Sequence, residues 1–259
     1  MKTNKFFLAA LTVMCAMTMT TVLTSCTNDD NPVTKPIEYG KVFNYTYEGK
    51  TLFYVIDEAS QTATLVAPLY PDYPKDEILR IDGWQGYEKP KGSVTIPESV
   101  EYGGKRFPMT ALGEGAFSLC SDISNVKLPE GITAIGPQVF DNCTGLKAVN
   151  LPNCLTSIEK WAFADCKSLS AIELPESLTA IGSNCFNGDE SLTAVTIPSN
   201  IETVSIAAFA NCTSLTTVNL PEGLTAIEDY AFSSCYSLSE INLPKGLTTI
   251  GNFAFDQCI

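Results

Sequence analysis

Apolar residues recur at a fixed spacing through most of this chain. From residue 128 onward a Leu-Pro or Ile-Pro pair returns every 23 residues, beginning at Leu128, Leu151, Leu174, Ile197, Leu220 and Leu243. A phenylalanine follows at one offset, as Phe117, Phe140, Phe163, Phe186, Phe209, Phe232 and Phe255. The apolar side chains of one unit cannot offset the entropy of ordering 23 residues, so the units must stack to be stable. The pattern predicts a solenoid of seven copies over residues 96–259, of which the last is incomplete.

The pattern inside one unit predicts a mainly β repeat. Apolar residues alternate just before each Leu-Pro, which is typical of a short parallel strand that the proline ends. The Leu-Thr-Ala-Ile segment predicts a second extended piece on the opposite side, and Ala-Phe-x-x-Cys predicts a tight helical turn that places Phe inside. The first copy differs by an insertion around residues 102–106.

Residues 38–95 do not repeat. Three β-rich segments, at 42–47, 51–56 and 62–66, are joined by polar turns. A solenoid needs an atypical end that covers its first coil, so we expect a small N-terminal β cap that merges into the repeats. An independent β module with its own ligand is the alternative.

The first residues have the layout of an export signal. Lys2 and Lys5 precede an uncharged apolar stretch over residues 6–22. Leu-Thr-Ser-Cys follows directly and ends at Cys26. This predicts a signal peptide over residues 1–25 and a linker over 26–37, with a transmembrane anchor as the alternative. Leu-Thr-Ser-Cys resembles a bacterial lipobox, and the residues after it resemble the acidic export tag of Bacteroidetes surface lipoproteins. The resemblance implies lipidation of Cys26, a membrane tether and a surface-exposed position at the outer membrane.

The iterated motif LPxxLxxIGxxAFxxCxxLxxI resembles the BspA-like, treponemal-type leucine-rich repeats of Bacteroidetes surface proteins. This resemblance covers residues 96–259 and implies a curved, right-handed leucine-rich-repeat coil. It also implies a secreted or surface-exposed protein of a family linked to adhesion. No catalytic residue and no cofactor are implied.

Composition narrows the function classes. Sixteen Lys and Arg against 29 Asp and Glu give a net charge of −13, which repels nucleic-acid phosphates, so no nucleic-acid partner is expected. The sequence contains no histidine, which removes the usual general base of Ser and Cys hydrolases and the commonest metal ligand. We therefore expect a protein that is not an enzyme and has no metal site or other cofactor.

Six cysteines share one repeat offset, and Asp189 fills that offset in the copy between Cys166 and Cys212. A stack of buried free thiols is the favoured interpretation, because neighbouring coils stack slightly too far apart for disulfides. Disulfides or a metal cluster are the alternatives, although close Cys-x-x-Cys pairs are missing from the sequence.

Two rows of side chains are candidate contact sites. Polar residues flank the buried residue of each predicted strand and should form one broad face, either a binding face or a solvated sheet surface. They include Asn125, Lys127, Asn150, Glu173, Thr196, Asn219, Glu240 and Asn242. Two residues before the repeat phenylalanine stand Trp161, Tyr230 and Phe253, as surface aromatics or as side chains partly buried between coils.

The sequence thus predicts a non-enzymatic cell-surface binding or adhesion lipoprotein whose repeat surface contacts extracellular protein or glycan of the host or environment. One alternative is a glycan-processing enzyme or accessory glycan-binding protein, and another is a structural envelope component. The incomplete last copy has no evident polar cap, so either the chain is truncated or Phe253 and Phe255 stay partly exposed and favour dimerisation.

Overall fold

The computed structural model describes residues 20–23, 33–36, 42–69 and 82–259, and these residues form strands and turns without a helix. The strands are β1 (Thr20–Leu23), β2 (Val33–Pro36), β3 (Phe43–Tyr47), β4 (Lys50–Asp57), β5 (Thr62–Val66), β6 (Gly92–Thr95), β7 (Ser99–Tyr102), β8 (Lys105–Leu112), β9 (Ile123–Lys127), β10 (Ala134–Ile135), β11 (Ala148–Asn150), β12 (Ser157–Ile158), β13 (Ala180–Ile181), β14 (Ala194–Thr196), β15 (Thr203–Val204), β16 (Thr217–Asn219), β17 (Ala226–Ile227) and β18 (Thr249–Ile250). Most of the predicted signal peptide and linker, including the predicted lipidation residue Cys26, lies outside the described residues. The described parts of these two segments are β1 and β2, which pair antiparallel with each other.

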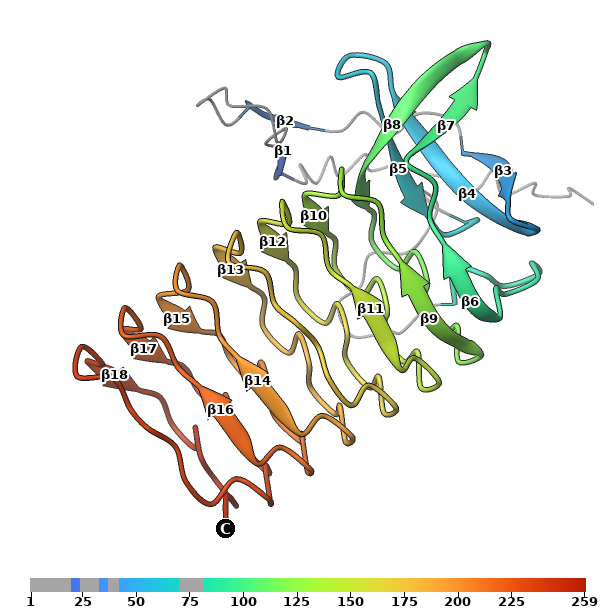
Figure 1. The fold of residues 1–259 in the computed structure, drawn as a ribbon. Helices are drawn as coiled ribbons and strands as arrows, with labels where there is room; N and C mark the ends of the chain where they lie inside the picture. The colour runs from blue at the N-terminus through green and yellow to red at the C-terminus, as the bar shows by residue number, and fades with distance from the viewer. Residues whose placement is uncertain (1–19, 24–32, 37–41, 70–81) are drawn as a thin grey trace, which may run out of the picture.

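The repeats wind into a stack of coils with a parallel ladder on each of two sides (Figure 1). On one side β6, β9 and β11 pair in order, and β14 pairs with β16. Within the repeats these pairings join residues 23 apart, for example Val126 with Val149. On the other side run β8, β10, β12 and β13, followed by β15, β17 and β18. The predicted mainly β, leucine-rich-repeat solenoid with 23-residue repeats is confirmed.

The first side carries fewer strands than the sequence pattern predicts. Residues 171–173 and 240–242 lie at the positions of strands, but the described backbone has no ladder there. Ile172 is nevertheless buried between exposed Ala171 and Glu173. The alternation of side chains is therefore kept even where the ladder hydrogen bonds are lost.

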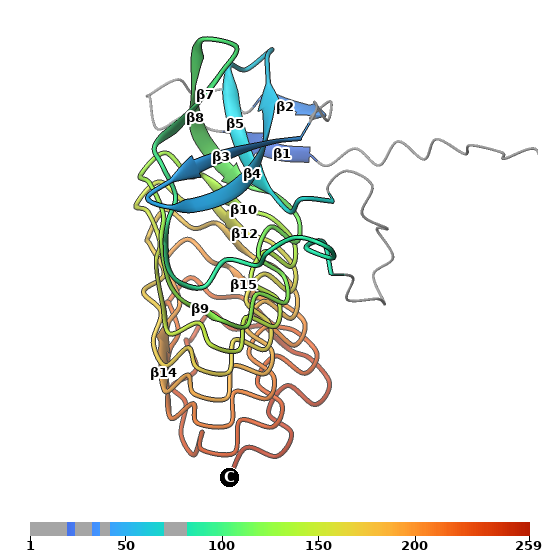
Figure 2. The ribbon, with the colours of Figure 1, turned by 90° about the vertical axis from the view of Figure 1, so that its right-hand side faces the viewer.

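The N-terminal cap is an antiparallel sheet of β3, β4 and β5 that closes one end of the stack (Figure 2). β5 pairs in parallel with β8, and β8 pairs with β10, so the cap and the first repeats share one sheet. The insertion of the first copy is the β7–β8 hairpin, whose Gly103 and Gly104 both have positive φ, as a two-residue turn requires. The expected cap is confirmed, and its sheet is continuous with the repeats.

The repeat phenylalanines form one continuous file along the axis of the stack. Ring centroids from Phe117 to Phe255 are 5.0–5.6 Å apart, and the ring planes are 7–23° from parallel. The rings from Phe117 to Phe232 have no exposed surface. Each ring therefore covers the face of the next, and the file is the centre of the hydrophobic core.

The turn that carries each phenylalanine is not the helical turn that the sequence predicts. Its backbone is left-handed two residues before and two residues after the ring, as at Gln138 and Asn142 around Phe140. The amides of these three residues point along the stack and donate to carbonyls of the next coil, with N···O distances of 2.7–3.1 Å. A helix would direct these amides into its own preceding turn, so the coil-to-coil hydrogen bonds exclude it.

The cysteine column is a set of buried free thiols. None of the eight cysteines among the described residues forms a disulfide. From Cys143 onward, each repeat thiol donates to the carbonyl of the phenylalanine in the preceding coil, as from Cys143 Sγ to Phe117 O at 3.1 Å. Cys120, in the first copy, donates instead to Ser118 O. Burial raises the pKa of Cys120 and of Cys235 to about 12, which keeps these thiols protonated and unreactive.

Asp189 interrupts this column with a fully buried carboxyl group. Its Oδ1 accepts the Cys166 amide at 2.8 Å, while its Oδ2 has no hydrogen-bond partner. Burial raises the pKa of Asp189 well above its usual range, and the charge of Asp165 raises it further. The folded chain therefore holds Asp189 as a neutral acid.

Removing one ring from the file should destabilise the whole stack. Phe186→Ala is expected to cost about 3–5 kcal/mol, because it opens a cavity between two stacked neighbours. Phe255→Ala should cost less, because Phe255 is only half-buried. Urea denaturation of both variants measures the difference, and equal losses would contradict a central role for the file.

Asp189→Cys should stabilise the protein at neutral pH. The variant restores the thiol of the repeat and removes a buried oxygen without a partner, which is worth about 1–3 kcal/mol. The unfolded chain releases the Asp189 proton near pH 4, whereas the folded chain retains it to higher pH. Stability of the parent is therefore lost as pH rises above about 4, and the advantage of the variant should grow over that range.

Urea denaturation between pH 4 and pH 7 tests this dependence. Asp122→Asn is the control, because it removes an exposed carboxyl group elsewhere in the repeats. A gain from Asp189→Cys that is the same at every pH would count against a neutral, buried carboxyl group.

Candidate functional site

The polar residues predicted to flank the strands lie together on one exposed surface. We call this surface the polar face; all its predicted members are exposed, and the apolar residues between them point inward. They are Asn125, Lys127, Asn150, Glu173, Thr196, Asn219, Glu240 and Asn242, with the small residues Ala148, Ala171, Ala194 and Thr217 among them.

The polar face begins one strand earlier than the sequence analysis places it. Ser93 and Thr95 on β6 lie opposite Asn125 and Lys127 on β9, and Asn125 Nδ2 donates to Ser93 Oγ at 3.3 Å. The signal was present in the sequence, because Ser93-Val94-Thr95 stands before Ile96-Pro97 with the same alternation as the later strands.

Several side chains of this face already link neighbouring coils. Asn150 Oδ1 accepts the Leu128 amide at 2.8 Å, and Asn150 Nδ2 donates to the Leu128 carbonyl at 3.1 Å. Asn219 Nδ2 donates to Thr196 Oγ1 at 3.0 Å. These hydrogen bonds fix the side chains of Asn150 and Asn219, so a ligand would meet a partly preorganised surface.

The three candidate aromatics do not form one row. Tyr230 and Phe253 are 45% and 59% exposed and stack on each other at 5.3 Å, whereas Trp161 is half-buried. Buried Ala207 and half-buried Asn184 occupy the coils between them. All five residues have left-handed backbone, so this column is fixed by the turn geometry and not by the chemistry of its side chains.

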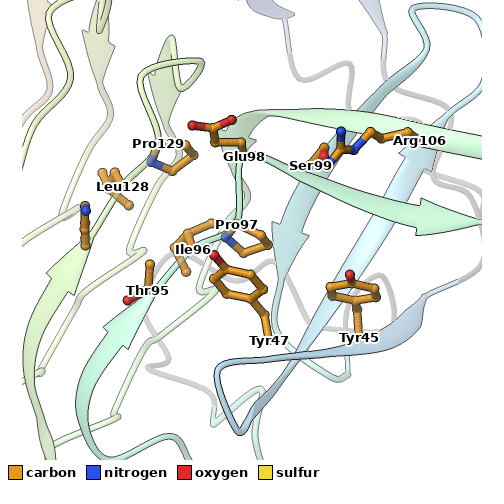
Figure 3. Close-up of a pocket in the computed structure, with 11 residues that line it drawn as sticks. Tyr45, Tyr47, Thr95, Ile96, Pro97, Glu98, Ser99, Arg106, Leu128 and Pro129 are labelled. Atoms are coloured by element: carbon orange, nitrogen blue, oxygen red, sulfur yellow. The ribbon is translucent and has the colours of Figure 1, made fainter.

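A pocket of about 270 Å³, which the sequence analysis did not identify, opens where the polar face meets the cap (Figure 3). Tyr45 and Tyr47 project into it from β3, and Ser99 and Arg106 line it from the β7–β8 hairpin. Glu98 and the segment after β6 form another wall, and Lys127 joins it from the polar face. We call this site the junction pocket.

The cations of the junction pocket have no partner in the part of the chain that the structure describes. The side chains of Arg106 and Lys127 form neither a hydrogen bond nor an ion pair there. Glu101 lies opposite Arg106 in the hairpin register, yet the two side chains form no ion pair. The positive charge of the pocket is therefore available to a ligand.

The described residues offer little for catalysis. No group of three His, Cys, Asp or Glu side chains among them is placed to hold a metal ion. Glu173 and Glu240 on the polar face lie three coils apart, which is about 14 Å at the usual strand spacing. The carboxyl pairs of glycosidases are about 5–9.5 Å apart, so these two cannot act as one.

A search for membrane-spanning segments within the same described ranges finds no helix that is long and apolar enough to cross a bilayer. Cys26, the predicted lipidation residue, lies outside the described residues.

Similarity to solved structures supports the fold. The chain is 32% identical to a leucine rich cell surface protein from Faecalibacterium prausnitzii, over 83% of this chain and 52% of that one, with a TM-score of 0.68. It thus spans about half the length of that relative. A leucine rich repeat protein of T. pallidum is 28% identical over 77% of this chain and 83% of that one, with a TM-score of 0.65. One from Bacteroides ovatus is 25% identical over 83% and 57%, with a TM-score of 0.57.

Comparison with family models identifies the repeats themselves. None of the curated proteins compared with the chain matches it. The model of the BspA type leucine rich repeat region matches with six copies, over residues 92–216 and 179–259. Because these matches span well over half of the 259 residues, and the coils stack as that repeat requires, the chain belongs to the BspA-type leucine-rich-repeat family.

Proposed function

We propose that this protein is a non-enzymatic, lipid-anchored binding protein of the cell surface, whose polar face contacts extracellular protein or glycan. The observation that supports this role best is the polar face itself, a preorganised exposed surface that runs over successive coils. A relative with the same fold is described as a leucine rich cell surface protein, which fits an extracellular task.

A surface position explains the N-terminal sequence. Export by residues 1–25 and lipidation of Cys26, with residues 26–37 as the linker, would place the cap and the repeats of residues 38–259 outside the outer membrane. Acyl chains contribute about 0.8 kcal/mol for each buried CH₂ group, so lipidation can hold an acidic protein that anionic lipids repel.

The two other functions have less support. A glycan-processing enzyme needs paired carboxyl groups at short range, and Glu173 and Glu240 on the polar face are three coils apart. A structural envelope component requires no binding surface, and the binding experiment below separates it from the leading proposal.

Blocking the polar face should abolish partner binding without harming the fold. Ala148→Arg and Ala194→Arg place bulky side chains on the face, and neither alanine side chain makes a hydrogen bond. Ala180→Arg is the matched control, because Ala180 is also an exposed alanine but lies on β13, in the opposite ladder. Binding of the purified protein to arrays of matrix proteins, mucins and polysaccharides is the measurement.

We expect the two face variants to lose at least tenfold in affinity for any partner that the parent binds, while the control variant retains it. Binding to no member of the arrays by a folded parent protein would reject the binding role and favour a structural component.

Substituting Cys26 should release the protein from the membrane. Cys26→Ala removes the thiol that would receive the lipid, so the variant should shift from the detergent phase to the aqueous phase in a detergent partition assay. Cys235→Ala is the control, because it removes a cysteine of the repeats, far from the N-terminus. Detergent-phase partition of Cys26→Ala equal to that of the parent would contradict lipid anchoring at this residue.

A further inference from the structure

We propose that the junction pocket binds one ring of an acidic sugar, a hexuronic acid residue, and pairs its carboxylate with Arg106. This inference rests on the proposed binding role and deepens it, since it names a ligand class for a defined site next to the polar face. It predicts binding of a small sugar that does not depend on the rest of that face.

The tyrosines supply a wall suited to a sugar ring. Tyr45 and Tyr47 are alternate residues of β3, so they point to the same side of the strand, and both are half-buried. Tyr45 rests edge-on against Tyr54, at 6.4 Å and 82°, which fixes its ring. The hydroxyl ends of both tyrosines point toward the opposite wall of the pocket (Figure 3). Such side chains offer an apolar ring face and a polar tip, as a sugar ring does.

The charges of the pocket favour a single carboxylate. Arg106 is one of only two arginines in a chain of net charge −13, and its guanidinium can pair with both oxygens of a carboxylate. Lys127 adds a second cation, and Glu98 adds one anion, which gives the lining a net charge of +1. Glu98 can accept hydrogen bonds from sugar hydroxyl groups, whereas it would repel a phosphate dianion.

The size of the pocket limits the ligand to one ring. Its volume of about 270 Å³ lies just below the range of about 300–1,000 Å³ that is usual for small-molecule sites. The carboxylate of an acidic amino-acid side chain could also pair with the cations. Such a side chain has no ring to pack on the tyrosines and no hydroxyl groups to donate to Glu98.

A second hollow near the cap lacks the same features. It is lined by Lys50, Lys89 and Lys91, but two of these amines are already engaged. Lys50 Nζ donates to the Lys91 carbonyl at 2.6 Å, and Lys89 Nζ pairs with Asp82 at 2.8 Å. No tyrosine lines it, so the junction pocket is the better match to an acidic sugar.

The test is titration calorimetry of the purified protein with two sugars that differ only in the carboxylate. We expect methyl α-galactopyranosiduronate to bind saturably and methyl α-galactopyranoside to bind at least about tenfold more weakly, because the charge-assisted contacts are lost. Free glutamate should also bind about tenfold more weakly. Raising the salt concentration should weaken binding of the uronate.

Variants assign the binding to this pocket. Arg106→Gln and Tyr47→Ala should each reduce uronate affinity about tenfold. Lys245→Gln and Tyr236→Ala remove an exposed lysine and an exposed tyrosine elsewhere in the repeats and should leave affinity unchanged. Arg106 is exposed, so its substitution should not unfold the chain. If Tyr47→Ala lowers the melting temperature, Tyr47→Phe tests the contribution of the hydroxyl group alone.

Three results would overturn the inference: no saturable uronate binding, equal binding of the neutral sugar or glutamate, or full affinity in Arg106→Gln. The polar-face variant Ala194→Arg separates the two proposals. It should lose the macromolecular partner and keep the uronate, whereas uronate loss in this variant would place the sugar on the polar face.

Discussion

The structure depends on the hydrogen bonds that run from coil to coil along the stack. Around each ring of the file, three amides leave their own turn and donate to the next coil, as Gln138, Phe140 and Asn142 do. The left-handed backbone on both sides of the ring makes this possible. Such backbone costs about 1 kcal/mol for an ordinary residue, and the hydrogen bonds together with ring burial offset it.

This constraint explains why one column tolerates such different side chains. The turn requires a left-handed residue two positions before the ring, and Trp161, Ala207 and Phe253 all meet that requirement. Their side chains range from buried Ala207 through half-buried Trp161 to exposed Phe253, so the offset sets the backbone conformation and not the burial of the side chain. The offset two residues before each repeat phenylalanine is therefore a set of equivalent backbone positions. It is not a row of contact side chains.

The features that depend on the 23-residue repeat could be predicted from the sequence. The features that depend on where a turn directs its amides, or on contacts between the cap and the repeats, could not. The file from Phe117 to Phe255 and the alternation of the polar face follow from fixed offsets, and the cap strands follow from β-rich segments separated by polar turns. The prediction of a helical turn at each repeat phenylalanine was wrong, because the short apolar motif fits both a helical turn and the turn observed. The two differ in the acceptors of the backbone amides, which here lie in the next coil. The junction pocket draws residues from β3, the β7–β8 hairpin and the polar face, which no spacing connects.

Asp189 shows what the cysteine column contributes. In the other coils from Cys143 onward, a thiol lies beside the ring file and donates to the phenylalanine carbonyl of the preceding coil. Cysteine suits this place because it is small, largely apolar and still a weak donor. The carboxyl of Asp189 takes the same offset but accepts an amide, and it leaves one oxygen without a partner. The column therefore persists through packing and one weak hydrogen bond per coil, without disulfides.

The cap creates the junction pocket because it extends only one of the two ladders. β5 continues the ladder that includes β8 and β10, whereas the ladder on the polar face ends at β6. The tyrosines of β3 approach this open edge from the side and leave a hollow between the cap and the strand end. A glycan that lies along the polar face would therefore reach Tyr45 and Tyr47 where the strand ladder ends.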